Sequence, residues 1–195
     1  FDESSPGQRP VYWIPRPTRV MTTAEEKRQQ HIVEYILYVW QMEDLVRAVN
    51  LDLGALRTHL SSAYNGDRLE AELAWFGDLI QSLRREKKTA KGHIGALDEV
   101  MIELTYLHRT LLDVLKDEEY KAAAELAKPH MDEMAKRGEP TGTEVEAMLV
   151  ALYGWLVLRM GGKSVSEDTQ ESLDVIRDWA NILGNRFVRM RAGEL

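Results

Sequence analysis

The sequence predicts an all-α protein, a single bundle of about seven helices that follows an irregular, proline-rich N-terminal arm. From residue 22 onward, apolar residues recur at spacings of three and four, which is the period of an amphipathic helix. No segment shows the alternation of apolar and polar residues that is typical of a strand. The chain has 195 residues, of which 44% are hydrophobic and 29% charged, and this is typical of one globular domain.

Residues 1–20 are the predicted arm, and residues 21–195 are the predicted helical domain. Four of the six prolines of the chain lie in the arm. Proline lacks a backbone donor and holds the preceding residue in an extended conformation, so we expect no regular helix there.

The first two helices are predicted from their N-terminal caps. Thr23 and Glu26 have the spacing of a capping box, which starts a helix that runs to about residue 50. Asp52 can cap a short second helix, and the sequence "NGD" at 65–67 favours a turn after it.

The third and fourth helices, over about 68–89 and 93–116, are predicted from one-sided apolar stripes. The stripes consist of Leu69, Leu73, Phe76, Ile80 and Leu83 in the third helix and of Leu97, Val100, Leu104, Leu107, Leu111 and Leu115 in the fourth. Such a stripe faces the core while the rest of the helix faces water.

The last three helices begin after Asp117, Thr143 and Ser166, each of which can cap a helix. In the fifth helix the apolar spacing continues across Pro129, which predicts a kink and not a stop. The sixth helix ends at the glycine pair 161–162, and the seventh runs towards the C-terminus.

Polar residues of the first helix fall on one side. This seam consists of Lys27, Gln30, Glu34 and Gln41, within about 60° on a helical projection. Nearly every other residue from 32 to 49 is apolar, so we interpret the seam as the solvent-facing edge of a core helix. Glu43 and Arg47 have the spacing of an exposed ion pair, and Asp44 can also reach Arg47.

Three segments carry a resemblance to a known family. They are "EKRQQHIVEYILYVWQMEDLVRAVNLDL", "GHIGALDEVMIELTYLH" and "ALYGWLVLRMGG". Together they resemble a bacterial family of helical proteins known as domain of unknown function 4924, over about residues 21–190. The resemblance implies a helical fold, and it implies no catalytic residues.

Most enzymatic chemistries lack their motif. The chain has no cysteine, which excludes disulfides, thiolate metal sites and a cysteine nucleophile. Gly-x-Ser-x-Gly, the P-loop and Gly-x-Gly-x-x-Gly are absent, and so is the Glu-x-x-His spacing of di-metal bundles. We therefore expect no metal and no cofactor, and we favour a protein that is not an enzyme.

His108 lies in the middle of the apolar stripe of the fourth helix. The simplest interpretation is a core histidine whose ring nitrogens are hydrogen-bonded. The alternative is an enzyme or small-ligand binder with a pocket between helices near His108, Glu34 and Gln41.

The net charge of −7 opposes nucleic-acid binding, which depends on neutralising phosphates, so nucleic acid is not an expected partner. A weaker alternative is a polyanion site at the basic run that ends the third helix: Arg84, Arg85, Lys87, Lys88 and Lys91. The same residues also suit the negative end of the helix dipole.

No apolar run is long enough to span a membrane. The longest, residues 147–158, is well under the roughly 20 residues that a helix needs to cross a bilayer. The N-terminus lacks the basic and apolar regions of a secretory signal. We therefore expect a cytoplasmic protein without membrane contact.

The sixth helix carries the leading functional hypothesis, because its residues 147–158 are apolar all round. Small residues Ala147, Ala151 and Gly154 lie on one side, and Leu149, Leu152 and Trp155 lie opposite. A second subunit would cover such a surface, so we expect a non-enzymatic interaction protein that forms a homodimer or binds another protein. The alternative is a monomer in which the first and sixth helices are both central.

Overall fold

A computed structural model describes residues 20–136 and 141–195, so the predicted arm lies almost wholly outside the described residues. The described residues form helices joined by loops, with no strand among them, and the predicted all-α class is confirmed. The helices are α1 (Thr23–Gln30), α2 (Ile32–Ala48), α3 (Leu53–Leu60), α4 (Gly66–Arg85), α5 (Ala96–Arg109), α6 (Glu118–Ala135), α7 (Glu144–Met160) and α8 (Glu167–Ala192), and a π-helical turn η1 (Thr110–Val114) extends α5.

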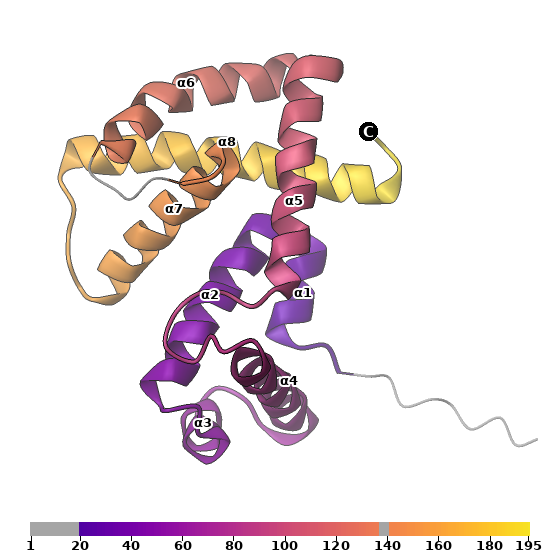
Figure 1. Ribbon diagram of the computed structural model, residues 1–195, viewed down its shortest axis with the longest axis vertical. Helices are drawn as coiled ribbons and strands as arrows, with labels where there is room; N and C mark the ends of the chain where they lie inside the picture. The colour runs from indigo at the N-terminus through magenta and orange to yellow at the C-terminus, as the bar shows by residue number, and fades with distance from the viewer. Residues whose placement is uncertain (1–19, 137–140) are drawn as a thin grey trace, which may run out of the picture.

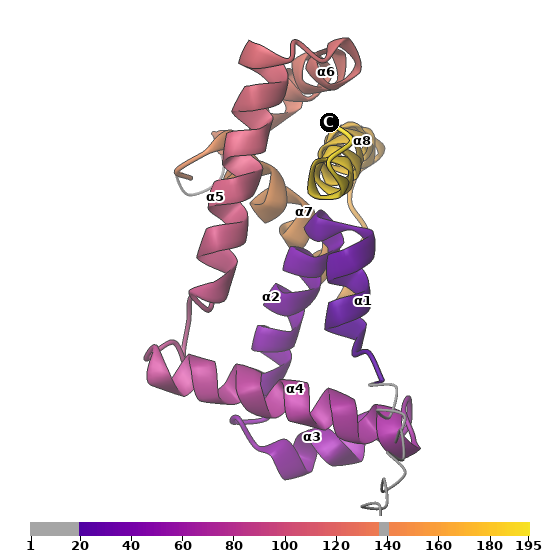
Figure 2. The same ribbon diagram turned by 90° about the vertical axis from the view of Figure 1, so that its right-hand side faces the viewer.

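The helices form two groups along the long axis of the molecule. Helices α1 to α4 lie at one end and α6 to α8 at the other, with α5 running between them (Figures 1 and 2). Helix α2 joins the groups, because it contacts α1 and α4 on one side and α7 and α8 on the other. Ile36, Val39 and Val46 of α2 are fully buried, and each contributes roughly 1.5–3 kcal/mol through apolar burial.

The predicted first helix is divided in two at His31. This residue has an extended backbone (φ −157°, ψ 108°), ends α1 and caps α2, where its Nδ1 accepts from the amide of Glu34 at 3.4 Å. Its ring packs on Gly184 of α8, where a Cβ would lie only 2.4 Å from ring atoms. The sequence around residue 31 holds no glycine or proline, so no breaker signal marks the division.

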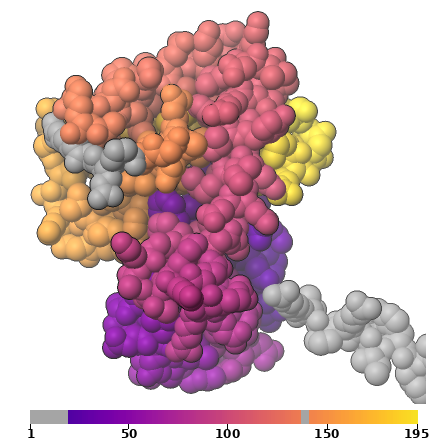
Figure 3. Space-filling view, in the orientation of Figure 1, coloured from indigo at the N-terminus to yellow at the C-terminus, as the bar shows by residue number. Residues whose placement is uncertain are grey.

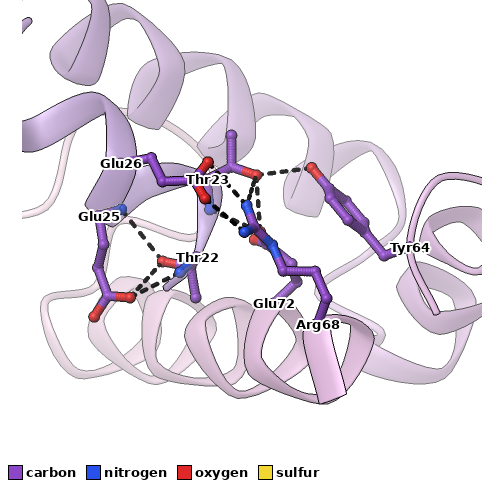
Figure 4. A network of polar contacts seen from close by, with 7 residues as sticks. All are labelled: Thr22, Thr23, Glu25, Glu26, Tyr64, Arg68 and Glu72. Carbon is purple, nitrogen blue, oxygen red and sulfur yellow. Dashed lines mark hydrogen bonds and ion pairs between the residues drawn. The ribbon is translucent and has the colours of Figure 1, made fainter. Parts of the chain in front are cut away.

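Helix α1 begins one residue earlier than the predicted capping box. Thr22 and Glu25 form the box, since the Thr22 side chain accepts from the Glu25 amide and the Glu25 carboxylate accepts from the Thr22 amide. Thr23 and Glu26 are thereby released for contacts with α4, which Figure 4 shows.

A polar network ties α1 to α4. Glu72 is fully buried, and its Oε1 accepts from the amide of Thr23 at 2.7 Å, from the Thr23 hydroxyl at 2.8 Å and from Nε of Arg68 at 3.0 Å (Figure 4). Arg68 also binds Glu26 at 2.6 Å, which holds the pKa of Glu26 below its ordinary value. A buried carboxylate needs partners of this kind, because desolvation strongly disfavours an isolated charge.

The other predicted helices are found close to their expected bounds. Asp52, Thr143 and Ser166 act as N-caps, each through a side-chain oxygen that accepts from the first turn. Helix α6 continues through Pro129, as the apolar spacing indicated. Helix α4 ends at Arg85, earlier than expected, and an irregular loop leads to α5.

The π-helical turn η1 changes the last part of the predicted α5 stripe. Residues of the stripe up to Leu111 are buried, whereas Leu115 is 48% exposed. A π turn adds a residue to the turn, so every side chain after it is rotated relative to a regular α-helix. The prediction that Leu115 faces the core was therefore wrong.

The contact between His31 and Gly184 can be tested with paired glycine substitutions. Gly184→Ala is expected to lower the free energy of unfolding by roughly 1–3 kcal/mol, because the new methyl group overlaps the His31 ring. Gly77→Ala is the control, since that helical glycine meets only a Leu53 methyl at 3.9 Å. Alanine at 77 should stabilise by up to about 1 kcal/mol. Urea denaturation measures the free energy of unfolding of both variants. An equal change in Gly184→Ala and Gly77→Ala would contradict the contact between His31 and Gly184.

Candidate functional site

Helix α7 has a buried side and an exposed apolar side. Leu149 and Leu152 were expected to need another helix or a second subunit to cover them. They are buried within the chain itself, where α7 contacts α8, α5 and α2. On the other side Val150, Val157 and Leu158 remain 49%, 43% and 38% exposed. Figure 3 shows α5, α6 and α7 reaching the surface on one face of the molecule.

The exposed side of α7 is named here the α7 outer face, and it consists of Val150, Ala151, Gly154, Val157 and Leu158. Spacings of three and four place these residues on one side of the helix. A Cβ added at Gly154 would meet no atom within 4 Å, so the helix backbone is open to close approach there. A solvent-facing helix side normally carries charged residues, and this one carries none.

Aromatic residues beside the α7 outer face are held by polar contacts. The Tyr153 hydroxyl donates to Asp44 of α2 at 2.5 Å. Trp155 lies under the guanidinium groups of Arg159 and Arg177, at 5.0 and 5.9 Å from the ring centroid. These contacts fix the two edges of the face, so it is presented as a rigid surface.

Exposed apolar residues of α5 adjoin the beginning of α7. Ile102 and Tyr106 are both largely exposed. They line a shallow hollow of about 460 Å³ together with Thr143 and Glu146 of the first turn of α7. Exposed apolar residues of α5 therefore lie across this hollow from the polar first turn of α7.

A groove of about 620 Å³, named here the α6–α7 groove, lies between α6, α7 and α8. Its apolar floor includes Ala124, Met131, Ala147 and Trp179, and the small alanine side chains leave the space open. Along the α6 rim, Lys121 pairs with Glu125 and Lys128 with Asp132, each at 3.9 Å. Asp113 of η1 and Glu144 of α7 also line the groove.

A chain of three hydrogen-bonded side chains lies behind this groove. His108 is buried, as predicted, with Nδ1 at 2.7 Å from the Tyr120 hydroxyl and Nε2 at 3.0 Å from Oε2 of Glu144. The ring also packs edge-on against Trp179. Both ring nitrogens therefore have partners, which is the simpler of the two interpretations given above.

Burial sets the direction of proton donation in this chain. It lowers the pKa of His108, against the opposing effect of Glu144, and it raises the pKa of Tyr120. His108 is thus neutral and Tyr120 protonated at neutral pH. Tyr120 donates to Nδ1, and Nε2–H donates to Glu144, which leaves Oε1 of Glu144 for other contacts.

Glu34 and Gln41 are not brought together with His108 around this groove. Glu34 is exposed and pairs with Lys27 at 3.1 Å, while the Gln41 amide donates to the Met160 sulfur. Neither residue lines the α6–α7 groove. The interpretation of Glu34 as a surface residue agrees with its exposure.

Glu43 is not the exposed partner of Arg47 that the sequence predicted. It is fully buried, with Oε2 at 2.6 Å from Nδ1 of His93 and Oε1 accepting from the amide of Ile94 at 2.8 Å. The His93 ring stacks on Trp40 with centroids 4.4 Å apart. A helical projection of α2 cannot reveal the loop that covers its C-terminal end, and that loop buries Glu43.

Arg47 holds the same loop from another side. It pairs with Asp44 at 3.0 Å, as expected, and its guanidinium also donates to the carbonyls of Lys88 and Gly92. Because the two carbonyl contacts join α2 to the loop that also covers Glu43, we assign the cluster a structural role.

The basic run lies at the end of α4 and in the loop after it. Arg84, Arg85, Lys87 and Lys91 are exposed, and Lys88 is half-buried. Arg84 donates to the Leu51 carbonyl, and Arg85 and Lys88 both lie near Glu86. Glu86 thus interrupts the positive charge, and the polyanion hypothesis remains a prediction.

Sequence reasoning missed Glu144, Tyr120 and Asp113 as neighbours of His108. Glu144 directly follows the Thr143 cap, and acidic residues are expected at that position in any helix. Tyr120 belongs to the apolar pattern of α6. Glu144 and Tyr120 therefore carried no signal that distinguished them from ordinary helix residues.

The part of the chain that the structure describes holds neither a metal-ion cluster nor a membrane-spanning helix. No group of three or more histidine and carboxylate side chains is placed to hold a metal ion there. Within the same residues, no helix combines the length and the apolarity that crossing a membrane requires.

A family model described as "Domain of unknown function (DUF4924)" matches residues 21–194. No curated protein and no solved structure matches the chain. The family match spans the three segments that carried the resemblance and confirms it. The description of the family states no activity.

The two glutamates of α2 are expected to differ in their effect on stability. Glu43→Ala should lower the free energy of unfolding by about 3 kcal/mol, because it leaves the Ile94 amide and His93 without their buried partner. Glu34→Ala should change it by less than about 0.5 kcal/mol, as surface substitutions do. Chemical denaturation of both variants measures the difference. A large loss for Glu34→Ala would reveal a partner for that carboxylate beyond Lys27.

Stability is expected to decrease as the pH falls below about 6.5, the ordinary pKa of histidine. Burial lowers the pKa values of both His31 and His108, whereas the unfolded chain binds these protons near its ordinary pKa of about 6.5. The contribution is therefore fully present above pH 6.5 and is lost as the pH falls towards the folded-state pKa. Asp117, whose pKa the Arg186 hydrogen bond lowers, acts only below this window.

Urea denaturation at pH 7.5 and 5.5 measures this decrease. His108→Gln removes one of the two titrating groups and keeps an amide donor, so its stability should fall less over the interval. Identical pH dependence in the wild type and the variant would contradict a neutral, buried His108.

Proposed function

The chain belongs to the family of domain of unknown function 4924, and we propose from its own geometry that it is a non-enzymatic interaction protein that acts as a homodimer. The α7 outer face carries this proposal. It is apolar along its whole length, rigid at both edges and open to close approach at Gly154. Exposed apolar surface of this kind is typical of protein–protein contacts.

The α7 outer face has the symmetry that a twofold contact requires. Val150 and Leu158 lie four residues on either side of Gly154, and Ala151 and Val157 lie three residues on either side. Two α7 helices packed antiparallel about an axis at Gly154 would give each residue an apolar partner. In such an isologous contact the same surface serves both subunits.

Glycine at the centre of the α7 outer face favours close packing of the two α7 helices. Without a side chain at position 154, two helix axes can approach to the lower end of the usual range of about 8–10 Å. Val150 of one subunit would then lie beside Leu158 of the partner subunit. The contact would remove from water the apolar side chains that each subunit leaves exposed.

The apolar residues of α5 supply further contact area. A stable specific interface buries roughly 1,200 Å² or more in total. Ile102 and Tyr106 offer further exposed apolar area across a hollow from the first turn of α7. The proposed interface therefore uses α7 at its centre and α5 at its edge.

Light scattering on the purified protein tests the dimer. We expect a mass of twice the 22.4 kDa chain at micromolar concentration. Val157→Glu should weaken association by about a hundredfold or more, since it places a charge in the apolar contact, at a cost of about 1.4 kcal/mol for each factor of ten. A monomeric wild type across a dilution series would contradict the proposal.

Val114→Glu is the matched control. Val114 is an exposed valine of η1 and does not belong to the α7 outer face, so this variant should remain a dimer. Circular dichroism should show unchanged helicity in both variants. Equal dissociation of both variants would show that the dimer uses a different surface.

A further inference from the structure

The α6–α7 groove has an unbalanced charge. The four rim residues of α6 compensate one another in two pairs, Lys121 with Glu125 and Lys128 with Asp132. The remaining charged residues of the groove lining are Asp113 and Glu144, and within the described residues neither forms an ion pair with a lysine or arginine. The groove therefore presents two carboxylates to whatever enters it.

Glu144 is held in place from behind. Its Oε2 accepts from the buried, neutral His108, whose other ring nitrogen accepts from Tyr120. Oε1 has no such partner and remains for a ligand. A carboxylate oriented by a buried hydrogen-bond chain loses little side-chain freedom when it binds, which favours recognition.

The rest of the groove suits an apolar body. Ala124, Met131 and Trp179 form its floor, and the methionine side chain adapts to different shapes. The volume of about 620 Å³ lies within the range of small-molecule sites, which combine a mostly apolar lining with a few polar groups. A π-helical turn, a feature frequent at functional sites, supplies Asp113.

We propose that the α6–α7 groove binds an organic cation with an apolar chain, such as an alkylammonium group. The ammonium would lie between Asp113 and Oε1 of Glu144, and the alkyl chain would lie on the floor towards Met131. Carboxylate and phosphate ligands are disfavoured by the two uncompensated carboxylates. Ala147, which lines this site, lies on the same side of α7 as Ala151 and Gly154, so the site adjoins the N-terminal end of the α7 outer face.

The same chemistry occurs in two sources, a free alkylamine and the lysine side chain of a peptide. Titration with hexylammonium and with an acetylated, amidated Ala-Lys-Ala peptide separates them. Tighter binding of hexylammonium supports a free amine as the natural ligand, and tighter binding of the peptide supports a lysine side chain.

NMR titration of the full chain tests the proposal. Hexylammonium should shift the amide signals of Gly142 and Thr143 and the indole signal of Trp179, which all line the groove. Hexanol, which has the same chain without the charge, should bind at least about fivefold more weakly, as loss of a charge-assisted contact implies. Hexanoate should not bind. Equal shifts with hexanoate or hexanol would overturn the assignment.

Substitutions in the groove identify the carboxylates. Glu144→Gln and Asp113→Asn should each raise the Kd for hexylammonium by about threefold to tenfold, as expected for one partly exposed ion pair. The double variants Lys121→Gln/Glu125→Gln and Lys128→Gln/Asp132→Asn are matched controls on the same groove, and each should change the Kd by less than about twofold because it removes a compensated pair and leaves the net charge of the groove unchanged. If the control variants weaken binding as much as Glu144→Gln, the proposed position of the ammonium is wrong.

His108 is a positioning residue for Glu144 in this proposal. His108→Gln keeps a donor directed at Glu144 and should retain most of the affinity for hexylammonium, whereas His108→Leu should raise the Kd by up to the same factor as Glu144→Gln, about threefold to tenfold. Equal affinities of these two variants would contradict the role of the hydrogen bond. Light scattering on the same samples reports the oligomeric state, so failure of amine binding and failure of the dimer are distinguished.

Discussion

The contact between the His31 ring and the backbone of Gly184 is the constraint on which the N-terminal half of the fold depends. His31 has an extended backbone at this contact, and the extended residue divides what would be one long helix into α1 and α2. The division turns α1 towards α4, where Glu72 and Arg68 bind its first turn. It also frees α2 to pass between the two ends of the molecule and to contact both.

Most helices could be predicted from the sequence because their signals are local. Each of three helix starts is predicted by the capping chemistry of a single side chain, and all three residues act as N-caps in the structure: Asp52, Thr143 and Ser166. The division at His31 could not be predicted, since no local residue marks it and the glycine on which the His31 ring packs belongs to another helix. Glu43 was misplaced for the same reason: periodicity describes one helix, and the loop that buries Glu43 is distant in the sequence.

The residues of the candidate site likewise fall into those that the sequence could identify and those that only the fold reveals. His108 was identified as buried because its position in the α5 stripe is a local property. Its partners Tyr120 and Glu144 come from two other helices, and only the fold brings them together. The α7 outer face was partly foreseen, since an all-apolar helix signals an uncovered surface. Which side stays open depends on where α8 packs.

The loop between α4 and α5 is the covalent link between the first four helices and the rest. Its two glycines and three lysines give it the composition of a flexible segment. Its backbone, however, is fixed by side chains on both sides: Glu43 and Arg47 from α2 and Glu86, which accepts from the Gly95 amide at 2.7 Å. The loop is thereby held against α2, so α5 leaves the first four helices from a fixed point and not from a swivel.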